Sequence, residues 1–334
     1  MAPADPLIRP LGIGPLRLPR NLVLAPMHGH THRPLRLLAR RQGAALAHTE
    51  MLTPEEVLHG ATKADEALTP VAEDRPLAVQ FLARDPAALA DAVALVAARG
   101  AADLVDLNLA CPAGRAVRTG RGGALLRQPD LAAPLVEAAV RASALPVTVK
   151  MRLGFSAAPD DRATALAAAR AAVGAGAVAV TLHGRAVLQG YRSRADWTAI
   201  ADWAAALAVP VLGSGDLRTP DAVLEMLRRT HAAGAAIARG ALGAPWIFRQ
   251  TMDLEGRGRF DPVGPAERRQ AVLDHFDGLA SQFGEATAVR LMRRLGCVYV
   301  RGLPHAAQAR ASFQAARTAA AFRAAVDRWL AMEQ

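Results

Sequence analysis

Eight short apolar segments, separated by longer alanine-rich stretches, constrain the fold of this chain more than any other feature. The segments lie at 21–27, 44–51, 76–82, 103–110, 146–153, 177–184, 209–215 and 234–240. Each is apolar at nearly every position, which is typical of parallel strands covered on both faces. The stretches between them, such as 85–99 and 220–229, have the apolar spacing of amphipathic helices. This alternation predicts an α/β fold, a (β/α)8 TIM barrel. A doubly wound sheet is disfavoured because no GxGxxG follows the first segment.

The pattern changes after about residue 250. Clustered glycine, proline and charge predict a linker at 253–267. The stretches that follow, at 265–284, 285–302 and 306–332, predict helices and no strand. We therefore expect a barrel domain at 1–250 and an all-helical C-terminal domain at 251–334.

The charge balance suits a polyanionic partner. Arginine and lysine total 40 against 30 acidic residues, a formal net charge of +10. Such an excess favours nucleic acid, although biased genome composition would explain it as well. Within 285–302, the positions of Arg290, Arg294 and Arg301 predict one shared helix face, either a row of phosphate contacts or a solvated basic face.

Other bulk features narrow the setting. No apolar run is long enough to span a membrane, and the N-terminus does not have the pattern of a signal peptide. The chain has 2 cysteines, too few for a disulfide framework, which fits the reducing cytoplasm. We expect a monomer with no membrane partner.

Polar residues occur where the predicted strands end. Active sites of TIM barrels lie at the carboxyl ends of the strands, so these residues should meet at one mouth. The residues at these strand ends, polar and apolar together, are Pro26, Met27, Glu50, Gln80, Asn108, Cys111, Lys150, His183, Arg185, Ser214, Gly215, Asp216, Ala238 and Arg239.

The last two strand ends predict a phosphate site. The sequences GSGD and ARGALGAP follow strands seven and eight. Glycines allow backbone N–H groups to approach an anion, helix N-termini favour negative charge, and Arg239 would add a charge-assisted hydrogen bond. Ordinary strand–helix turns would account for the same glycines.

Two strand ends carry residue types that are rare in this chain. Lys150 is one of only two lysines among many arginines, which indicates a place where a compact ammonium is required. Cys111 is followed at once by Pro112. It is either a small buried hydrophobe or a reactive thiol, whereas Cys297 lies in a predicted helix and is expected to pack there.

The histidines of PMHGHTH leave an alternative open. An HxH pattern after a first barrel strand, as in His28 and His30, begins some metal-dependent hydrolase sites, and His183 and Asp216 would be further ligands. No second histidine pair supports this, and we expect no metal.

Several ordered motifs give the chain a family resemblance. They include LAPMHGHTHRPLR, HTEM, DLNLACPAGRAV, PVTVKMRLGF, VTLHGRAVLQGY, VPVLGSGDL and IARGALGAPWIFRQ. With this order and these spacings, the chain resembles the bacterial tRNA-dihydrouridine synthases, FMN enzymes with a helical RNA-binding domain. The opening IGPLRLPRNLVLAPM and the later PWIFR look most like the B type of that family.

The resemblance implies a role for each matching residue. Cys111 would be the catalytic proton donor, and Asn108 and Arg185 would contact the substrate. Lys150 would lie near the flavin N1 and C2 carbonyl, and Gln80 would bond the edge of the ring. The remaining cofactor contacts would be Pro26, Met27, His28, His183, Ser214, Gly215, Asp216, Ala238 and Arg239. Arg290, Arg294 and Arg301 would bind tRNA.

The implied reaction saturates the C5–C6 bond of uracil. Reduced FMN, with NADPH as electron source, would give a hydride to C6, and an acid on the other face would protonate C5. A free thiol, with a pKa of about 8.5, is mostly protonated at neutral pH and can act as that acid. A flavin enzyme that reduces a free pyrimidine or another small enone remains the alternative.

The chain departs from the family pattern in places, one of which is the stretch after CP, where Gly114 and Arg115 replace the usual lysines. His28 stands where alanine is usual, His32 replaces aspartate, Ser214 replaces asparagine and Ala238 replaces glycine. The extra methyl group of Ala238 is expected to weaken FMN binding.

Overall fold

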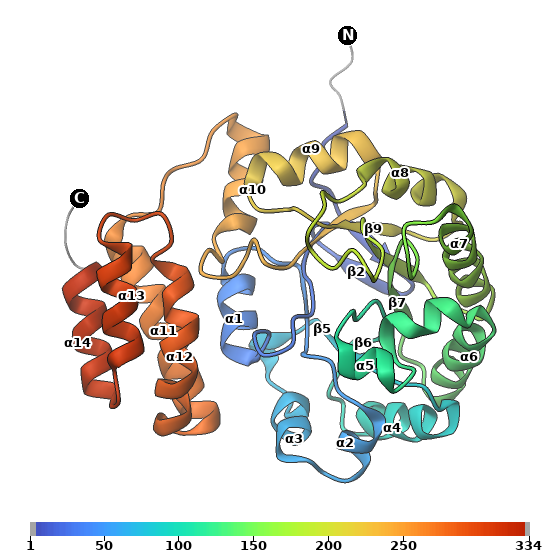
Figure 1. Ribbon diagram of the computed structural model, residues 1–334, viewed down its shortest axis with the longest axis horizontal. Coiled ribbons are helices and arrows are strands. Elements are labelled where there is room, and N and C mark those ends of the chain that lie inside the picture. Colours follow the sequence, from blue (N-terminus) through green and yellow to red (C-terminus); the bar gives the residue numbers. More distant parts are fainter. Residues whose placement is uncertain (1–4, 331–334) are drawn as a thin grey trace.

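The structure, a computed structural model, describes residues 5–330 and contains a closed barrel of eight parallel strands (Figure 1). The strands are β3 (Leu22–Leu24), β4 (Leu46–His48), β5 (Leu77–Phe81), β6 (Leu104–Leu109), β7 (Val147–Arg152), β8 (Ala179–His183), β9 (Val211–Ser214) and β10 (Gly234–Ile237). They follow one another around the barrel in chain order, and β10 closes against β3. The predicted TIM barrel is confirmed, and each strand lies inside its predicted segment.

Helices connect the strands on the outside of the barrel. They are α1 (Arg33–Arg41), α2 (Pro54–Leu58), α3 (Thr62–Leu68), α4 (Pro86–Ala98), α5 (Gly114–Arg118), α6 (Ala132–Ala142), α7 (Pro159–Gly174), α8 (Trp197–Ala206) and α9 (Pro220–Thr230), with short 3-10 turns at Ala72–Asp74, Gly122–Arg127 and Pro129–Leu131. Helix α9 shows how the sequence sets their ends. The Thr219 side chain accepts from the N–H of Ala222 at 3.2 Å, and Pro220 occupies the first turn, where its missing N–H costs nothing.

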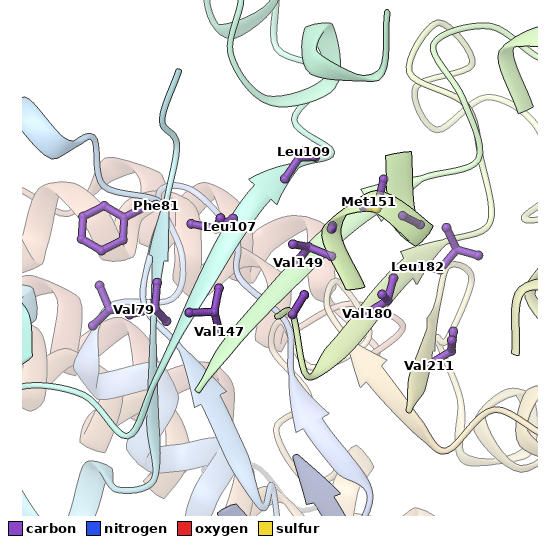
Figure 2. Packing of buried hydrophobic residues seen from close by; sticks show 14 of the residues in the cluster. Val79, Phe81, Leu107, Leu109, Val147, Val149, Met151, Val180, Leu182 and Val211 are labelled. Carbon is purple, nitrogen blue, oxygen red and sulfur yellow. The ribbon is translucent and has the colours of Figure 1, made fainter. Parts of the chain in front are cut away.

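Side chains on the central strands alternate between two environments. Figure 2 shows the residues that pack in the apolar layer under the helices, among them Val79, Leu107 and Val149. The residues between them, such as Asp106 and Lys150, point into the barrel, because successive side chains of a strand face opposite ways. This alternation carries the polar side chains to the inside of the barrel.

A two-stranded hairpin closes the amino-terminal end of the barrel. Strands β1 (Leu11–Ile13) and β2 (Leu16–Leu18) pair antiparallel, a feature that the sequence did not predict. Their apolar side chains join one buried cluster with Ala78 and Leu104 from the barrel interior. The opposite, carboxyl end of the barrel is therefore the one that remains open.

The helical region begins earlier than predicted. Helix α10 (Ile247–Arg257) runs through 253–257, so the predicted linker at 253–267 was too long. The connection is 258–264, after which α11 (Pro265–Phe283) starts. The error arose because Gly256 and nearby charges resemble a linker but face solvent on a helix. The predicted domain boundary near 250 falls within α10 and stays a prediction.

Helices α11, α12 (Glu285–Tyr299), α13 (Ala306–Ala315) and α14 (Ala319–Leu330) form a bundle beside the barrel (Figure 1). The predicted helix at 306–332 is two helices, because the Thr318 hydroxyl caps the second one at Ala321 N. The bundle has its own core, in which Phe276 stacks on Phe322 with ring centroids 5.2 Å apart. No helix within residues 5–330 is long and apolar enough to cross a membrane.

The bundle packs closely against α1. Gly278 of α11 lies so near Pro34 that a Cβ on the glycine would come within 2.8 Å of the proline Cβ. At one edge of this contact, Arg41 forms a salt bridge with Asp274 at 2.9 Å. The bundle is thereby held on the side of the barrel formed by β3 and β10.

Candidate active site at the barrel mouth

A cavity of about 530 Å³ opens at the carboxyl ends of the barrel strands. It brings together most of the residues that the sequence placed at strand ends. Those on its wall are Pro26, Met27, His28, Gln80, Asn108, Cys111, Lys150, His183, Ser214, Gly215, Asp216, Ala238 and Arg239. Arg185 and Glu50, also expected at this mouth, are not among its lining residues.

On the β5–β6 side, the two amide side chains are fixed by hydrogen bonds. Gln80 Nε2 donates to Asp106 at 2.7 Å, and Gln80 Oε1 accepts from Asn108 Nδ2 at 2.9 Å. Asn108 Oδ1 accepts from the backbone N–H groups of Ala110 and Cys111, at 2.9 and 2.8 Å. These bonds hold the start of the loop that carries the Cys111 thiol.

Cys111 is half-buried at the cavity wall and is not in a disulfide. Its backbone carbonyl accepts from Gly123 N at 3.0 Å. A Cβ on Gly122, whose φ is +59°, would come within 2.8 Å of the Cys111 Cβ. Only glycine permits this approach, so the thiol loop is pinned from behind as well as by Asn108.

Lys150, on β7, carries its ammonium into the cavity without an ion pair in the part of the chain that the structure describes. Burial, and to a smaller extent the nearby charge of Arg152, lower its pKa to about 8, while the Asp106 carboxylate opposes both effects. A negative charge placed beside such a buried lysine stabilises its protonated form.

His183, at the end of β8, has an unsatisfied polar atom. Its side chain is buried, and Nδ1 has no hydrogen-bond partner among the residues that the structure describes. Burial lowers its pKa, and the charges of Lys150 and Arg152 act in the same direction, so the ring is neutral at physiological pH. A buried neutral imidazole without a partner is completed by a ligand that can hydrogen-bond with it.

The β9 and β10 ends bring two arginine side chains, Arg218 and Arg239, to the cavity. Neither Arg218 nor Arg239 forms a salt bridge within residues 5–330. Burial lowers the pKa of Arg218, and the charges of Arg239 and Arg301 lower it further. The Asp216 carboxylate opposes this shift of the Arg218 pKa. Its own hydrogen bonds, however, go to Arg185 Nη2 at 2.6 Å and to Ala195 N at 2.8 Å.

The backbone at these two strand ends is close-packed. Gly215 has a φ of +119°, and a Cβ there would come within 2.7 Å of the Ala195 Cβ. A Cβ on Gly240 would come within 2.1 Å of the Leu217 carbonyl oxygen. The glycines of both predicted phosphate loops are therefore required by the barrel's own packing.

The cavity has lining residues that the sequence analysis did not single out. Arg152 is buried, and its Nε donates to the Ala110 carbonyl at 2.9 Å. The Tyr191 ring lies 3.9 Å from the Arg239 guanidinium carbon and packs edge-on against His183. Arg218 was also missed. The period of two along β7 pointed to Arg152, because it must face the same way as Lys150, but nothing local distinguished Tyr191 or Arg218.

The three histidines after β3 separate into two groups. His28 and His30 line the cavity, whereas His32 is turned toward Glu50 and packs against Phe283 of the bundle. Burial lowers the pKa of His32 to about 4. Across residues 5–330 there is no group of three or more histidine, cysteine, aspartate or glutamate side chains placed to hold a metal.

The predicted row of arginines is not a single helix face. Arg290 and Arg294 are exposed on α12, but α12 ends at Tyr299 and Arg301 lies in the turn beyond it. Arg294 reaches back to the barrel and donates to the Gly29 carbonyl at 3.1 Å. Arg301 lies close enough to Arg218 to affect its pKa. The spacing misled because the helix stops two residues before Arg301.

Comparison with family models gives a match to "Dihydrouridine synthase (Dus)" over residues 23–332. The chain belongs to the dihydrouridine synthase family. It is 35% identical over 323 residues to tRNA-dihydrouridine synthase B of Pseudomonas aeruginosa, covering 96% of both chains. It is 37% identical over 290 residues to a probable tRNA-dihydrouridine synthase of Rhodobacter capsulatus, covering 85% of this chain and 87% of the relative. The B-type resemblance is confirmed.

The fold of this dihydrouridine synthase is similar to solved barrels of distant sequence. Histamine dehydrogenase from Rhizobium sp. 4-9 matches with a TM-score of 0.59 and 14% identity, over 82% of this chain and 51% of that one. A 2-naphthoyl-CoA reductase matches with a TM-score of 0.58 and 12% identity, over 76% and 52%. This chain spans about half the length of these structures, which share its barrel.

Proposed function

We propose that this dihydrouridine synthase reduces specific uridines in tRNA to 5,6-dihydrouridine, with FMN as bound cofactor and NADPH as electron donor. The observation that carries the proposal is the position of Cys111. Its thiol stands at the cavity wall after β6, the strand opposite β10, where Arg239 forms no salt bridge with any of residues 5–330. A proton donor thus faces an anion-attracting wall across one cavity. Membership of the family and the names of the relatives support the same reaction.

The residues present fit FMN. Within the described part of the chain, Arg218 and Arg239 form no salt bridge at the β9 and β10 ends, where Ser214, Gly215, Asp216 and Ala238 would surround the phosphate. A phosphate would supply the acceptor oxygens that these guanidinium groups lack. Since the Asp216 carboxylate is bonded to Arg185, Asp216 would contribute backbone rather than charge.

The cofactor ring would occupy the centre of the same cavity. Pro26, Met27 and His28 would line it, His183 Nδ1 would gain its missing partner, and Gln80 would bond the ring edge. Lys150, cationic below its pKa of about 8, would stabilise negative charge near N1 and the C2 carbonyl.

The chain's own residues then account for the proton. When bound and reduced, FMN supplies the hydride that adds to C6 of uracil. Cys111 gives its proton to C5, which completes the saturated bond, and the resulting thiolate takes a proton from water. The Asn108 Oδ1 already accepts from two backbone N–H groups, and its Nδ2 donates to Gln80 Oε1 at 2.9 Å and to Met51 Sδ at 3.8 Å. The N–H that makes the long contact with sulfur would donate to the base instead. Arg185 lies away from the cavity and would act by holding Asp216.

A uridine must leave the RNA stack to reach this cavity. Arg290 and Arg294 are exposed on α12, on the side of the mouth where Arg301 and Arg218 gather, and we assign Arg290, Arg294 and Arg301 to tRNA phosphates. We place the reaction in the cytoplasm and expect the chain to act as a monomer.

The decisive experiment maps dihydrouridine in tRNA from cells with and without this protein, together with analysis of the cofactor released from the purified chain. We expect FMN in the protein and the loss of dihydrouridine at defined positions when the protein is absent. Turnover of free uracil with no effect on tRNA would favour the reductase of a free pyrimidine. A colourless protein that contains zinc would favour the metal-dependent hydrolase that His28 and His30 suggested.

A further inference from the structure

We infer that Asp106 is a positioning residue that sets the orientation of Gln80 and Asn108 and, through them, of the Cys111 loop; the inference rests on the proposed function. Asp106 is fully buried on β6 and is not a lining residue of the cavity. Its Oδ1 accepts from the Thr148 hydroxyl at 2.7 Å, and its Oδ2 accepts from Gln80 Nε2 at 2.7 Å.

The groups at the two ends of this hydrogen-bond chain require one and the same orientation of the Gln80 and Asn108 side-chain amides. An ionised carboxylate can only accept, so Gln80 must turn its NH2 toward Asp106 and its oxygen toward Asn108. At the other end, the N–H groups of Ala110 and Cys111 can only donate, so Asn108 must turn its oxygen toward them. Asn108 Nδ2 is then left to meet Gln80 Oε1, at 2.9 Å.

Reversing either amide breaks the chain. If Gln80 were flipped, its NH2 would face the NH2 of Asn108, and its oxygen would face the Asp106 carboxylate. If Asn108 were flipped, its NH2 would face the N–H groups that hold Cys111. An anion at Asp106 therefore stabilises one arrangement of four side-chain and backbone groups, and this arrangement ends at the residue that carries the thiol.

The position of Asp106 suits this task. Register pairs Gln80 with Asp106 and Asp106 with Thr148, so the three side chains form one layer inside the barrel, below Asn108 and Lys150. Each is anchored on a strand, and strand-borne groups hold their geometry better than loop-borne ones. Asp106 also affects the pKa values of Lys150 and His48, which face it from β7 and β4. Its test must therefore distinguish an effect on proton transfer from Cys111 from an effect on the cofactor through Lys150.

The test uses Asp106→Asn, which keeps the shape and removes the obligatory acceptor. In single-turnover reactions with reduced holoenzyme and tRNA, we expect dihydrouridine formation to slow roughly tenfold, the scale of a misplaced reacting group. FMN content and the rate of flavin reduction by NADPH should fall much less than this step, because Gln80 is only one of several residues proposed to hold the ring. Thr148→Val removes the hydroxyl that donates to Asp106 and should slow the step a few-fold. Thr181→Val makes the same change on β8, where the residue is not part of this hydrogen-bond chain, and should leave the rate unchanged.

A chemical readout is independent of turnover. Alkylation of Cys111, followed by mass spectrometry with Cys297 as internal reference, should change rate in Asp106→Asn and Thr148→Val but not in Thr181→Val. In a Cys111→Ala background, Asp106→Asn should cost little further rate, because both changes act on one proton transfer.

Three outcomes would overturn the inference. One is an unchanged single-turnover rate with unchanged Cys111 alkylation in Asp106→Asn. Another is an equal loss of flavin reduction, which would make Asp106 a partner of Lys150 instead. The third is full additivity with Cys111→Ala. If Asp106→Asn does not fold, Thr148→Val and the alkylation assay decide. A fully active Cys111→Ala would instead refute the proposed proton donor, so the two failures are distinguishable.

Discussion

The two halves of the barrel mouth are built on opposite principles. On β5 and β6, Asp106, Gln80 and Asn108 have hydrogen-bond partners from the chain itself. On β8 to β10, His183 Nδ1 has no partner, and Arg218 and Arg239 have no counter-charge among residues 5–330. Side chains whose hydrogen bonds are all satisfied within the protein hold a reacting group in place, whereas unsatisfied side chains gain their partners from a bound ligand. We therefore propose that the first half holds the reacting thiol, with Gln80 also reaching the cofactor ring, and that the second half binds the anionic end of the cofactor.

The largest expected effect on activity comes from the β5–β6 half of the mouth. Cys111→Ala should lower dihydrouridine formation by a factor of roughly 10² or more, the usual contribution of a positioned acid, and should leave FMN bound. Single-turnover kinetics with reduced enzyme would measure it. Cys297→Ala is the matched control, since the Cys297 thiol donates to the Arg293 and Arg310 carbonyls inside the helical bundle, and it should keep full activity. An active Cys111→Ala would break the assignment of chemistry to this half.

We expect the positive charge of the β8–β10 half to extend onto the helical bundle. Replacing Arg290, Arg294 and Arg301 by alanine should weaken tRNA binding by about tenfold or more and reduce the slope of log affinity against log salt by about 2 units. Arg141→Ala, which removes an exposed arginine of α6, is the control. A normal salt dependence in the triple variant would restrict the cationic surface to the cavity.

Arg239→Ala tests the cofactor-binding half directly. Loss of one charge-assisted hydrogen bond to a phosphate should raise the FMN dissociation constant about tenfold. Quenching of flavin fluorescence would measure it, with Arg170→Ala on the outer face of α7 as control. Unchanged FMN affinity alongside weaker tRNA binding would show that these cations serve RNA and not the cofactor.

Lys150 lies between the two halves and gives a pH dependence. Its pKa in the free protein is about 8, and a ligand with negative charge raises it. The contribution of Lys150 to FMN affinity is therefore complete below pH 8 and falls as pH rises above it, by a few-fold. Titration of the apoprotein with FMN at several pH values would test this. Lys150→Met should bind more weakly and lose the inflection; an inflection that survives belongs to another group.

Ala238→Gly should have the smallest effect. Removing the methyl group restores the residue usual in the family at the predicted phosphate loop, and we expect FMN affinity to rise about two- to threefold. The same titration would measure it, with Ala233→Gly, half-buried at the other end of β10, as control. Weaker binding in Ala238→Gly would mean that the methyl group supports the loop.

Sequence reasoning succeeded where a rule acts along the chain. Short, nearly continuous apolar runs located every barrel strand, and the strand-end rule located Cys111, Lys150 and His183. It failed where a neighbour from elsewhere decides. The β1–β2 hairpin is too short to show a pattern of its own, and α10 looks like a linker until its apolar face meets the barrel. The helix face assigned to Arg301 failed because the helix ends at Tyr299.

The amino-acid order by itself determined the architecture and the residue types at the mouth, because strand periodicity and strand ends are local properties. Tertiary structure decided which of those groups are satisfied. Gln80, Asp106 and Thr148 are far apart in sequence, and only the barrel register makes one layer of them. Hydrogen-bond polarity depends on which atoms face each other across strands, so the paired and unpaired halves of the mouth became visible only in the folded barrel.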